Sequence, residues 1–377
     1  MRDLRLFSGD HQHQDFPRYR NWFPTAVMPA SKNPQPLPSG ELSDLPAHFR
    51  SAGSMRSTSE FLAATNTVAV LVMVDGHVRH ESYALTGGPD VAWISWSVAK
   101  SFTSTLIGCA VDDGSIVSID DPAQRYAPEL AGSAYDGVSI RHILQMSSGV
   151  AWNEDYGDAQ SDIHPLIEVL HGTGSHDAAV RATRRDAEPG TLCRYASIET
   201  QALGLLLARA TGTTVAAYMH EKLCEPLGMT SDGYWLLDRD GREMTYAGLM
   251  LTARDFARLG ELYRCGGGWN GRQVLSESWV AASTRPDGAH ARPGRPQIAG
   301  QPLPDGYGYQ WWLMPGTRGD YAAIGVYNQY VYVDPDRQAV VVRLAANPRY
   351  GTTPDHSGDE DEASIKFMRA AVDQLTA

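Results

Sequence analysis

A stretch in the first third of the chain, residues 94–114, constrains the fold more than any other. From Val98 onward apolar residues recur at helical spacing, and Gly114 supplies a stop signal. The pattern predicts a buried helix with Ser97 at its start. Because residues three apart lie on one face of a helix, the hydroxyl of Ser97 should face the amine of Lys100 across a single turn.

This pairing suits nucleophilic catalysis. A serine hydroxyl is a poor nucleophile until a base takes its proton, and a lysine can be that base if desolvation lowers its pKa from about 10. A helix start also directs free N–H groups toward an anionic intermediate. The alternative is a capping serine beside a solvated lysine. The chain has only four lysines, and Lys100 alone has a serine three residues before it.

Composition excludes several classes of partner. The formal net charge of the 377 residues is -12, and the one basic cluster, residues 181–185, is small. A nucleic acid or an anionic membrane is not attracted to such a surface. The four cysteines and the histidines follow no metal-ligand spacing, so neither a metal nor another cofactor is expected. No signal peptide or membrane span is evident, and we expect a cytoplasmic protein that acts on a small molecule.

The remaining pattern is that of a mixed α and β protein. Residues 1–55, rich in Pro, Ser and Gly, predict an extended arm that lies on the surface or contacts another subunit, so a homodimer is possible. Asp75-Gly76 predicts a hairpin between strands 68–74 and 77–83. Further strands are predicted at 307–314, 328–333 and 339–345. Further helices are predicted at 199–210, 215–223, 252–263 and 362–375.

Several of these segments together carry a family likeness. Ser97-Val-Ala-Lys100, the block 139–149 and Pro189-Gly-Thr-Leu-Cys-Arg-Tyr-Ala-Ser197 resemble serine hydrolases related to class C β-lactamases and penicillin-binding proteins. Residues 126–137, Asn153-Glu-Asp-Tyr156 and Gly325-Val-Tyr-Asn-Gln329 are similar to segments of the 6-aminohexanoate-dimer hydrolases, which cleave a linear amide. The likeness covers roughly residues 60–350.

The resemblance implies an α+β, β-lactamase/transpeptidase-like fold, in which helices flank an antiparallel sheet and an all-helical insertion interrupts it. The corresponding division is an arm at 1–55, an α/β sandwich of 56–119 with 245–377, and a helical sub-domain at 120–244. The catalytic cleft would lie between the last two.

The resemblance also implies catalytic roles. Ser97 would be the acylated nucleophile, Lys100 the base, and Tyr195 a second acid or base that relays a proton to the leaving group. A phenol near a cationic amine is easier to ionise, and the two groups could share one proton. The oxyanion would be held by the backbone N–H groups of Ser97 and Val326.

Other positions are implied to bind substrate, and here the chain departs from its relatives. Tyr156 matches a tyrosine that engages substrate, and Ser197 stands where the wider superfamily has Asn. Tyr246 stands where a nylon-oligomer hydrolase can carry Asn. Tyr327 ends the strand 323–327, which lacks the Lys-Thr-Gly element that grips a β-lactam carboxylate, so efficient penicillin binding is not expected.

The sequence thus predicts a serine hydrolase for a small ester or linear amide. An acyltransferase on the same Ser97, Lys100 and Tyr195 site is the alternative, because the difference lies in whether the cleft excludes water and binds an acceptor. A ligand-binding relative without catalysis would have lost one of the three residues. Neither a Gly-x-Ser-x-Gly elbow nor a His-Glu-x-x-His motif occurs.

Overall fold

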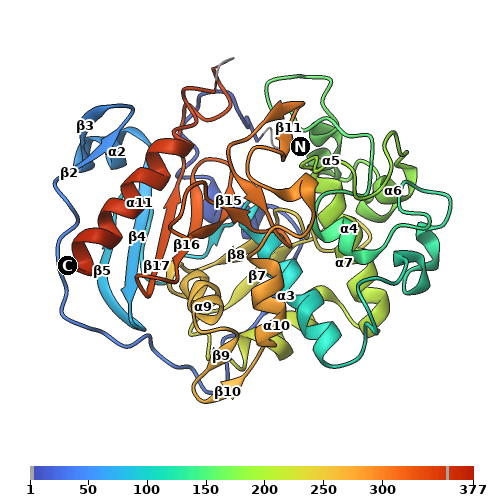
Figure 1. Ribbon diagram of the computed structural model, residues 1–377, viewed down its shortest axis with the longest axis horizontal. Helices are drawn as coiled ribbons and strands as arrows, with labels where there is room; N and C mark the ends of the chain where they lie inside the picture. Colours follow the sequence, from blue (N-terminus) through green and yellow to red (C-terminus); the bar gives the residue numbers. More distant parts are fainter. Residues whose placement is uncertain (1–3, 354–355) are drawn as a thin grey trace.

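The computed structural model describes residues 4–353 and 356–377, and its main sheet has seven antiparallel strands (Figure 1). Their order across the sheet is β13-β14-β15-β16-β17-β4-β5. In chain order they are β4 (Thr67–Val74), β5 (His77–Tyr83), β13 (Gly306–Tyr307), β14 (Trp312–Leu313), β15 (Tyr321–Gly325), β16 (Gln329–Asp334) and β17 (Ala339–Ala345). The β4–β5 hairpin turns at Asp75 and Gly76, both with positive φ, as the sequence predicts.

Helices cover both faces of this sheet, which explains why β4 is apolar from Val68 to Val74. Leu71 and Met73 of β4 face a core shared with α3 (Val98–Asp112) and α9 (Ala253–Arg264). Val70 and Val72 face the opposite core, shared with α11 (Asp361–Leu375). Because alternate side chains of a strand point to opposite faces, a strand buried on both sides is apolar at every position.

A mainly helical region lies beside the sheet, in green at the right of Figure 1. Its α-helices are α4 (Ile140–Leu144), α5 (Ile163–Glu168), α6 (His176–Ala182), α7 (Ser197–Thr211) and α8 (Val215–Met219). A second sheet, in the order β1-β7-β8-β6, connects this region to the rest. Its strands are β1 (Thr25–Met28), β6 (Trp93–Ile94), β7 (Gly233–Leu236) and β8 (Leu249–Leu251).

The first 55 residues, predicted as an extended arm, contain short helices and strands and pair with the rest of the protein. They carry α1 (Tyr19–Trp22) and β1, and β1 pairs with β7 of the helical region. The hairpin of β2 (His48–Ser51) and β3 (Ser54–Ser57) then leads into α2 (Thr58–Ala64). The boundaries of the three predicted segments remain a prediction.

One predicted strand is wrong in detail. Residues 307–314 form not one strand but β13 and β14, which pair with each other across a tight turn. Gln310 has a φ of 63°, and a Cβ on Gly308 would lie 1.9 Å from the carbonyl oxygen of Ser283. Aromatic and β-branched composition predicts extended backbone, whereas this turn depends on close contact with a distant segment.

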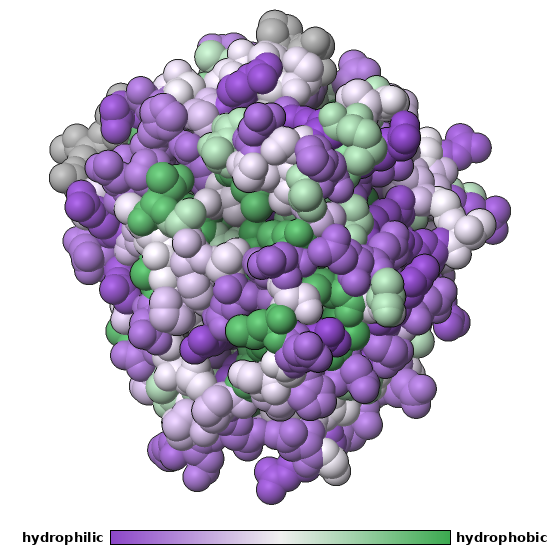
Figure 2. Space-filling view, turned by 90° about the vertical axis from the view of Figure 1, so that its left-hand side faces the viewer, coloured by the Kyte–Doolittle hydropathy of each residue, from purple (hydrophilic) through white to green (hydrophobic). Residues whose placement is uncertain are grey.

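The smaller elements lie at the periphery. They are α10 (Glu277–Ser283), the pair β9 (Gly268–Trp269) with β10 (Arg272–Gln273), and the pair β11 (Gln297–Ile298) with β12 (Gln301–Pro302). The face nearest α11 is mainly polar, with apolar side chains in separate patches (Figure 2). Across the described residues no single helix meets the length and hydropathy needed to cross a bilayer, although α7 and the bent segment after it, Val215–Cys224, meet them as a pair.

Candidate active site

The first turn of α3 brings a serine hydroxyl and a lysine amine together. Ser97 is the N-cap of the helix, and Lys100 Nζ donates a 2.8 Å hydrogen bond to Ser97 Oγ. The amine also donates to Ser197 Oγ and to the carbonyl oxygen of Tyr246, both at 3.0 Å. Lys100 is 1% exposed. Its amine is thus fixed against the hydroxyl from which it would take a proton.

Burial gives this lysine the properties of a base. Desolvation lowers the pKa of Lys100 from 10.5 to about 7, while the nearby charge of Glu154 acts in the opposite direction. About half of the amines with such a pKa are neutral near pH 7, and a neutral amine can accept the serine proton.

Tyr195 lies against the same amine, and its phenol behaves differently from the sequence-based expectation. Lys100 Nζ is 5.0 Å from the centroid of the Tyr195 ring. Burial, and then the charge of Glu154, raise the pKa of Tyr195 well above its usual value, although a hydrogen bond with Ser97 lowers it. The expectation that a cationic lysine would ease its ionisation is wrong, because burial of the phenol and the charge of Glu154 raise its pKa. The phenol therefore keeps its proton and is suited to act as an acid.

Two backbone N–H groups meet beside Ser97. Within the described residues, neither the N–H of Ser97 nor that of Val326 has a hydrogen-bond acceptor. The end of β15 approaches the start of α3 so closely that a Cβ on Gly325 would lie 3.0 Å from Ser97 N. Glycine at this position permits the approach. The pair has the composition of an oxyanion site.

A cavity of about 560 Å³ opens at Ser97, Tyr195 and Val326. It lies between β14, β15 and α11. Its apolar lining includes Ile298, Leu303, Trp312, Met314, Ile324 and Ile365. The N–H of Met314 bonds to Asp320 O, five residues before Gly325, so at about 3.3 Å per residue the cavity follows β15 for roughly 15 Å. Charged side chains also line it, namely Asp305, Asp361, Glu362, Lys366 and Arg369.

The other predicted substrate residues differ in their placement. Tyr156 lines the cavity, and its hydroxyl donates to Glu154 Oε1 at 3.2 Å. Ser197 does not line the cavity, and its hydroxyl instead accepts a hydrogen bond from Lys100. Tyr246 contributes its carbonyl oxygen to Lys100, and its phenol is directed away, to Leu166 O at 3.1 Å. Tyr327 is 2% exposed, and its ring packs among other aromatic rings outside the cavity lining.

Comparison with known proteins assigns the chain to a family. The family model described as Beta-lactamase matches residues 56–363. The chain belongs to the beta-lactamase family. This membership confirms the predicted family likeness, the β-lactamase/transpeptidase-like fold and the assignment to the serine hydrolases.

Individual relatives and solved structures resemble the chain to different degrees. A 6-aminohexanoate-dimer hydrolase from Paenarthrobacter ureafaciens is 30% identical over 358 residues, which cover 90% of this chain and 86% of that protein. A Bacillus anthracis protein provisionally named as a 6-aminohexanoate-dimer hydrolase has a structure with a TM-score of 0.82 at 22% identity, covering 100% of this chain and 98% of its own. EstCE1, a hydrolase with promiscuous acyltransferase activity, gives a TM-score of 0.63 at 18% identity, with 83% and 96% covered.

In this beta-lactamase family member, Glu154 is a site residue that sequence reasoning missed. Its carboxylate accepts hydrogen bonds from Ser197 Oγ at 2.5 Å and Ser197 N at 2.9 Å, and also from Trp152 Nε1 and the Tyr156 hydroxyl. The side chain is 1% exposed. Glu154 stands in the segment 153–156 that carries the family likeness, but nothing in its spacing indicates which side chains it contacts.

Proposed function

We propose that the protein hydrolyses a small ester or a linear amide through an acyl-enzyme on Ser97. The observation that carries the proposal is the 2.8 Å hydrogen bond between Ser97 Oγ and an amine whose pKa burial lowers to about 7. A surface lysine with its ordinary pKa would hold its proton at neutral pH and could not serve as the base.

In the acylation step Ser97 Oγ bonds to the carbonyl carbon and gives its proton to Lys100 Nζ. The carbonyl electron pair moves onto oxygen, where the N–H groups of Ser97 and Val326 stabilise it. As the bond to the leaving group breaks, Tyr195 gives that group a proton and regains one from Lys100. Acyl-enzyme and a free amine or alcohol result.

Water completes the cycle. Tyr195 passes its own proton to neutral Lys100 and takes one from the water, whose oxygen bonds to the acyl carbon; Lys100 then holds the proton that Ser97 regains. The bond from Ser97 Oγ to that carbon then breaks, and Ser97 regains its proton. The products are a carboxylic acid and the enzyme in its starting state, so no cofactor takes part in this scheme.

The shape of the cavity supports an elongated apolar substrate. A lining of Trp312, Met314 and Ile324 offers burial to an aliphatic chain but no charge-assisted clamp for a carboxylate next to the reacting carbonyl. We therefore expect turnover of butyrate and hexanoate esters to exceed that of benzylpenicillin.

Acyl transfer to an amine or alcohol is the second candidate. An apolar acceptor would bind the same mainly apolar lining and compete with water for the acyl-enzyme.

The test is release of p-nitrophenolate from short acyl p-nitrophenyl esters, with and without an added amine and with products identified by mass. We expect wild type to release nitrophenolate and yield free acid, and Ser97→Ala to be inactive. Ser104→Ala is the matched control, since Ser104 lies on the same helix and bonds Tyr309 O at 2.8 Å. Accumulation of amide with little hydrolysis would identify an acyltransferase, and equal activity in Ser97→Ala would refute both candidates.

A further inference from the structure

The backbone beside each proposed oxyanion donor has an unfavourable conformation. Trp96, which precedes Ser97, has a φ of 46°, and Tyr327, which follows Val326, has a φ of 63°. Aromatic residues seldom adopt this left-handed region, and they keep it only where the surroundings hold them there. The residues that pack against Trp96 and Tyr327 therefore help to determine where the two N–H groups lie.

Phe16, from the first segment of the chain, packs against both residues. Its ring centroid is 5.5 Å from that of Trp96 and 5.1 Å from that of Tyr327, and both contacts are edge-on. Trp96 and Tyr327 are themselves 5.9 Å apart. Phe16 is fully buried, so the three rings form one closed contact. Such aromatic contacts have a preferred geometry as well as apolar area.

Phe7 adds a second contact from the same segment. Its backbone N–H donates a 2.7 Å hydrogen bond to the Tyr327 hydroxyl, and its ring stacks on Tyr327 with centroids 5.3 Å apart. The Phe7 ring also lies 4.7 Å from that of Tyr156, which lines the cavity. Phe7 and Phe16 thus both contact Tyr327, in the turn that follows β15.

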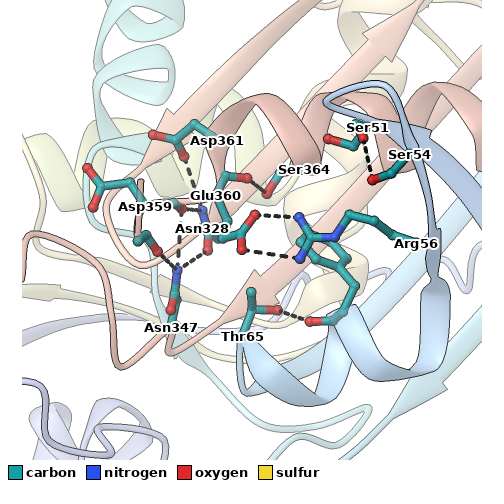
Figure 3. Close-up of polar contacts among 12 residues, drawn as sticks. Ser51, Ser54, Arg56, Thr65, Asn328, Asn347, Asp359, Glu360, Asp361 and Ser364 are labelled. Carbon is teal, nitrogen blue, oxygen red and sulfur yellow. Dashed lines mark hydrogen bonds and ion pairs between the residues drawn. The ribbon is translucent and has the colours of Figure 1, made fainter. Parts of the chain in front are cut away.

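Hydrogen bonds hold Asn328, the next residue of this turn (Figure 3). Asn328, whose φ is 68°, donates from Nδ2 to the carbonyl oxygen of Asp359 at 2.7 Å and to Asp361 Oδ1 at 3.1 Å. Asn347 Nδ2 donates to Asn328 Oδ1 at 3.0 Å. These bonds join the turn to the start of α11, whereas the aromatic contacts join it to Trp96, beside the start of α3.

We propose that Phe16 is a positioning residue of the oxyanion site. By packing against Trp96 and Tyr327 together, it sets the distance between the N–H of Ser97 and the N–H of Val326. This inference rests on the proposed function, and it gives the N-terminal segment a role in catalysis although it contributes no group to the reaction.

The two N–H donors act on the oxyanion, which forms only in the transition state. If they are held less firmly, kcat should fall and KM should stay nearly unchanged. A purely structural role would instead lower thermal stability and leave the rate per folded active site as it was.

The experiment compares Phe16→Leu with Phe61→Leu. Phe61 is also buried at 1% exposure, but it packs against Phe49 and Phe367 on the opposite side of the sheet. The measurements are kcat and KM for p-nitrophenyl butyrate per titrated active site, the Ki of butylboronic acid, which forms a tetrahedral adduct with a nucleophilic serine, and the melting temperature.

For Phe16→Leu we expect kcat to fall about tenfold, the Ki of butylboronic acid to rise by a similar factor, and KM to change less than twofold. Phe61→Leu should melt at a lower temperature with kcat and Ki as in wild type. Phe16→Met is the second variant, because it keeps most of the side-chain volume and removes only the ring that contacts Trp96 and Tyr327. It should lower kcat about threefold, and it carries the test if Phe16→Leu does not fold.

Unchanged kcat and Ki in a folded Phe16→Leu protein, or in Phe16→Met where Phe16→Leu does not fold, would overturn the inference. So would equal losses in Phe16→Leu and Phe61→Leu. Failure of the proposed function would be seen separately, as wild-type turnover that persists in Ser97→Ala.

Discussion

The first turn of α3 and the loop that carries Glu154 serve the same amine by different means. On α3, Ser97 and Lys100 are three residues apart, and helical geometry alone brings them to 2.8 Å. Glu154 lies outside any helix or strand and reaches the site through contacts with Ser197, 43 residues further along the chain. The first arrangement is local and the second depends on the whole fold.

The difference separates two kinds of catalytic contribution. In the proposed mechanism the helix supplies the reacting groups, whereas Glu154 holds Ser197, whose hydroxyl accepts from Lys100 at 3.0 Å. Loss of a reacting group removes a chemical step. Loss of a group that holds another shifts geometry and pKa, so the predicted effects should follow that order.

Replacement of the base should have the largest effect. Lys100→Met removes the amine that is hydrogen-bonded to Ser97 Oγ, and kcat for p-nitrophenyl butyrate should fall about a thousandfold. Lys222→Met is the control, since Lys222 pairs with Asp113 and Glu221 away from the cavity. Activity of Lys100→Met within tenfold of wild type would remove the distinction between the two regions.

The loss of kcat in Tyr195→Phe should depend on the leaving group of the substrate. An anilide needs a proton as its amine departs, so kcat for an acyl anilide should fall about a hundredfold. Nitrophenolate departs without one, and its ester should lose less than tenfold. Tyr332→Phe, whose hydroxyl bonds Asp320, is the matched control. Equal losses with both substrates would show that Tyr195 is not the acid for the leaving group.

A moderate effect is expected for Glu154→Gln, with kcat lower by about tenfold because Ser197 loses a charged acceptor. The charge of Glu154 raises the pKa of Lys100, so its removal should lower that pKa further. Since the neutral amine is the base, kcat/KM should rise with pH through about 7 in wild type and have its midpoint at lower pH in the variant. A midpoint shifted upward, or a shift also seen in Glu168→Gln at an exposed site, would contradict this role.

A second buried glutamate should affect stability rather than rate. Burial raises the pKa of Glu199 from 4.5 to about 8, so the folded protein keeps a proton that the unfolded chain releases between these values. Wild type should therefore lose stability as pH rises from 5 to 8, by on the order of 3 kcal/mol relative to Glu199→Gln. Urea unfolding at both pH values measures the difference, and an equal pH dependence in the two proteins would contradict it.

Local features were predictable from the sequence because they depend on residues close together in the chain. The β4–β5 hairpin and the helix start at Ser97 are of this kind. The placement of Tyr327 is not, because composition cannot tell that Phe7 and Phe16, more than 300 residues earlier, bury its ring. The same holds for Glu154, which reads as an ordinary polar loop residue until the fold brings Ser197 to it.

The central claim is that Ser97 is acylated during turnover, and rapid-quench intact-mass analysis with peptide mapping tests it most directly. With p-nitrophenyl butyrate in excess, we expect a butyryl adduct on the peptide that contains Ser97, formed as fast as nitrophenolate is released and absent in Ser97→Ala. An adduct on another residue, or turnover that continues in Ser97→Ala without any adduct, would contradict the claim.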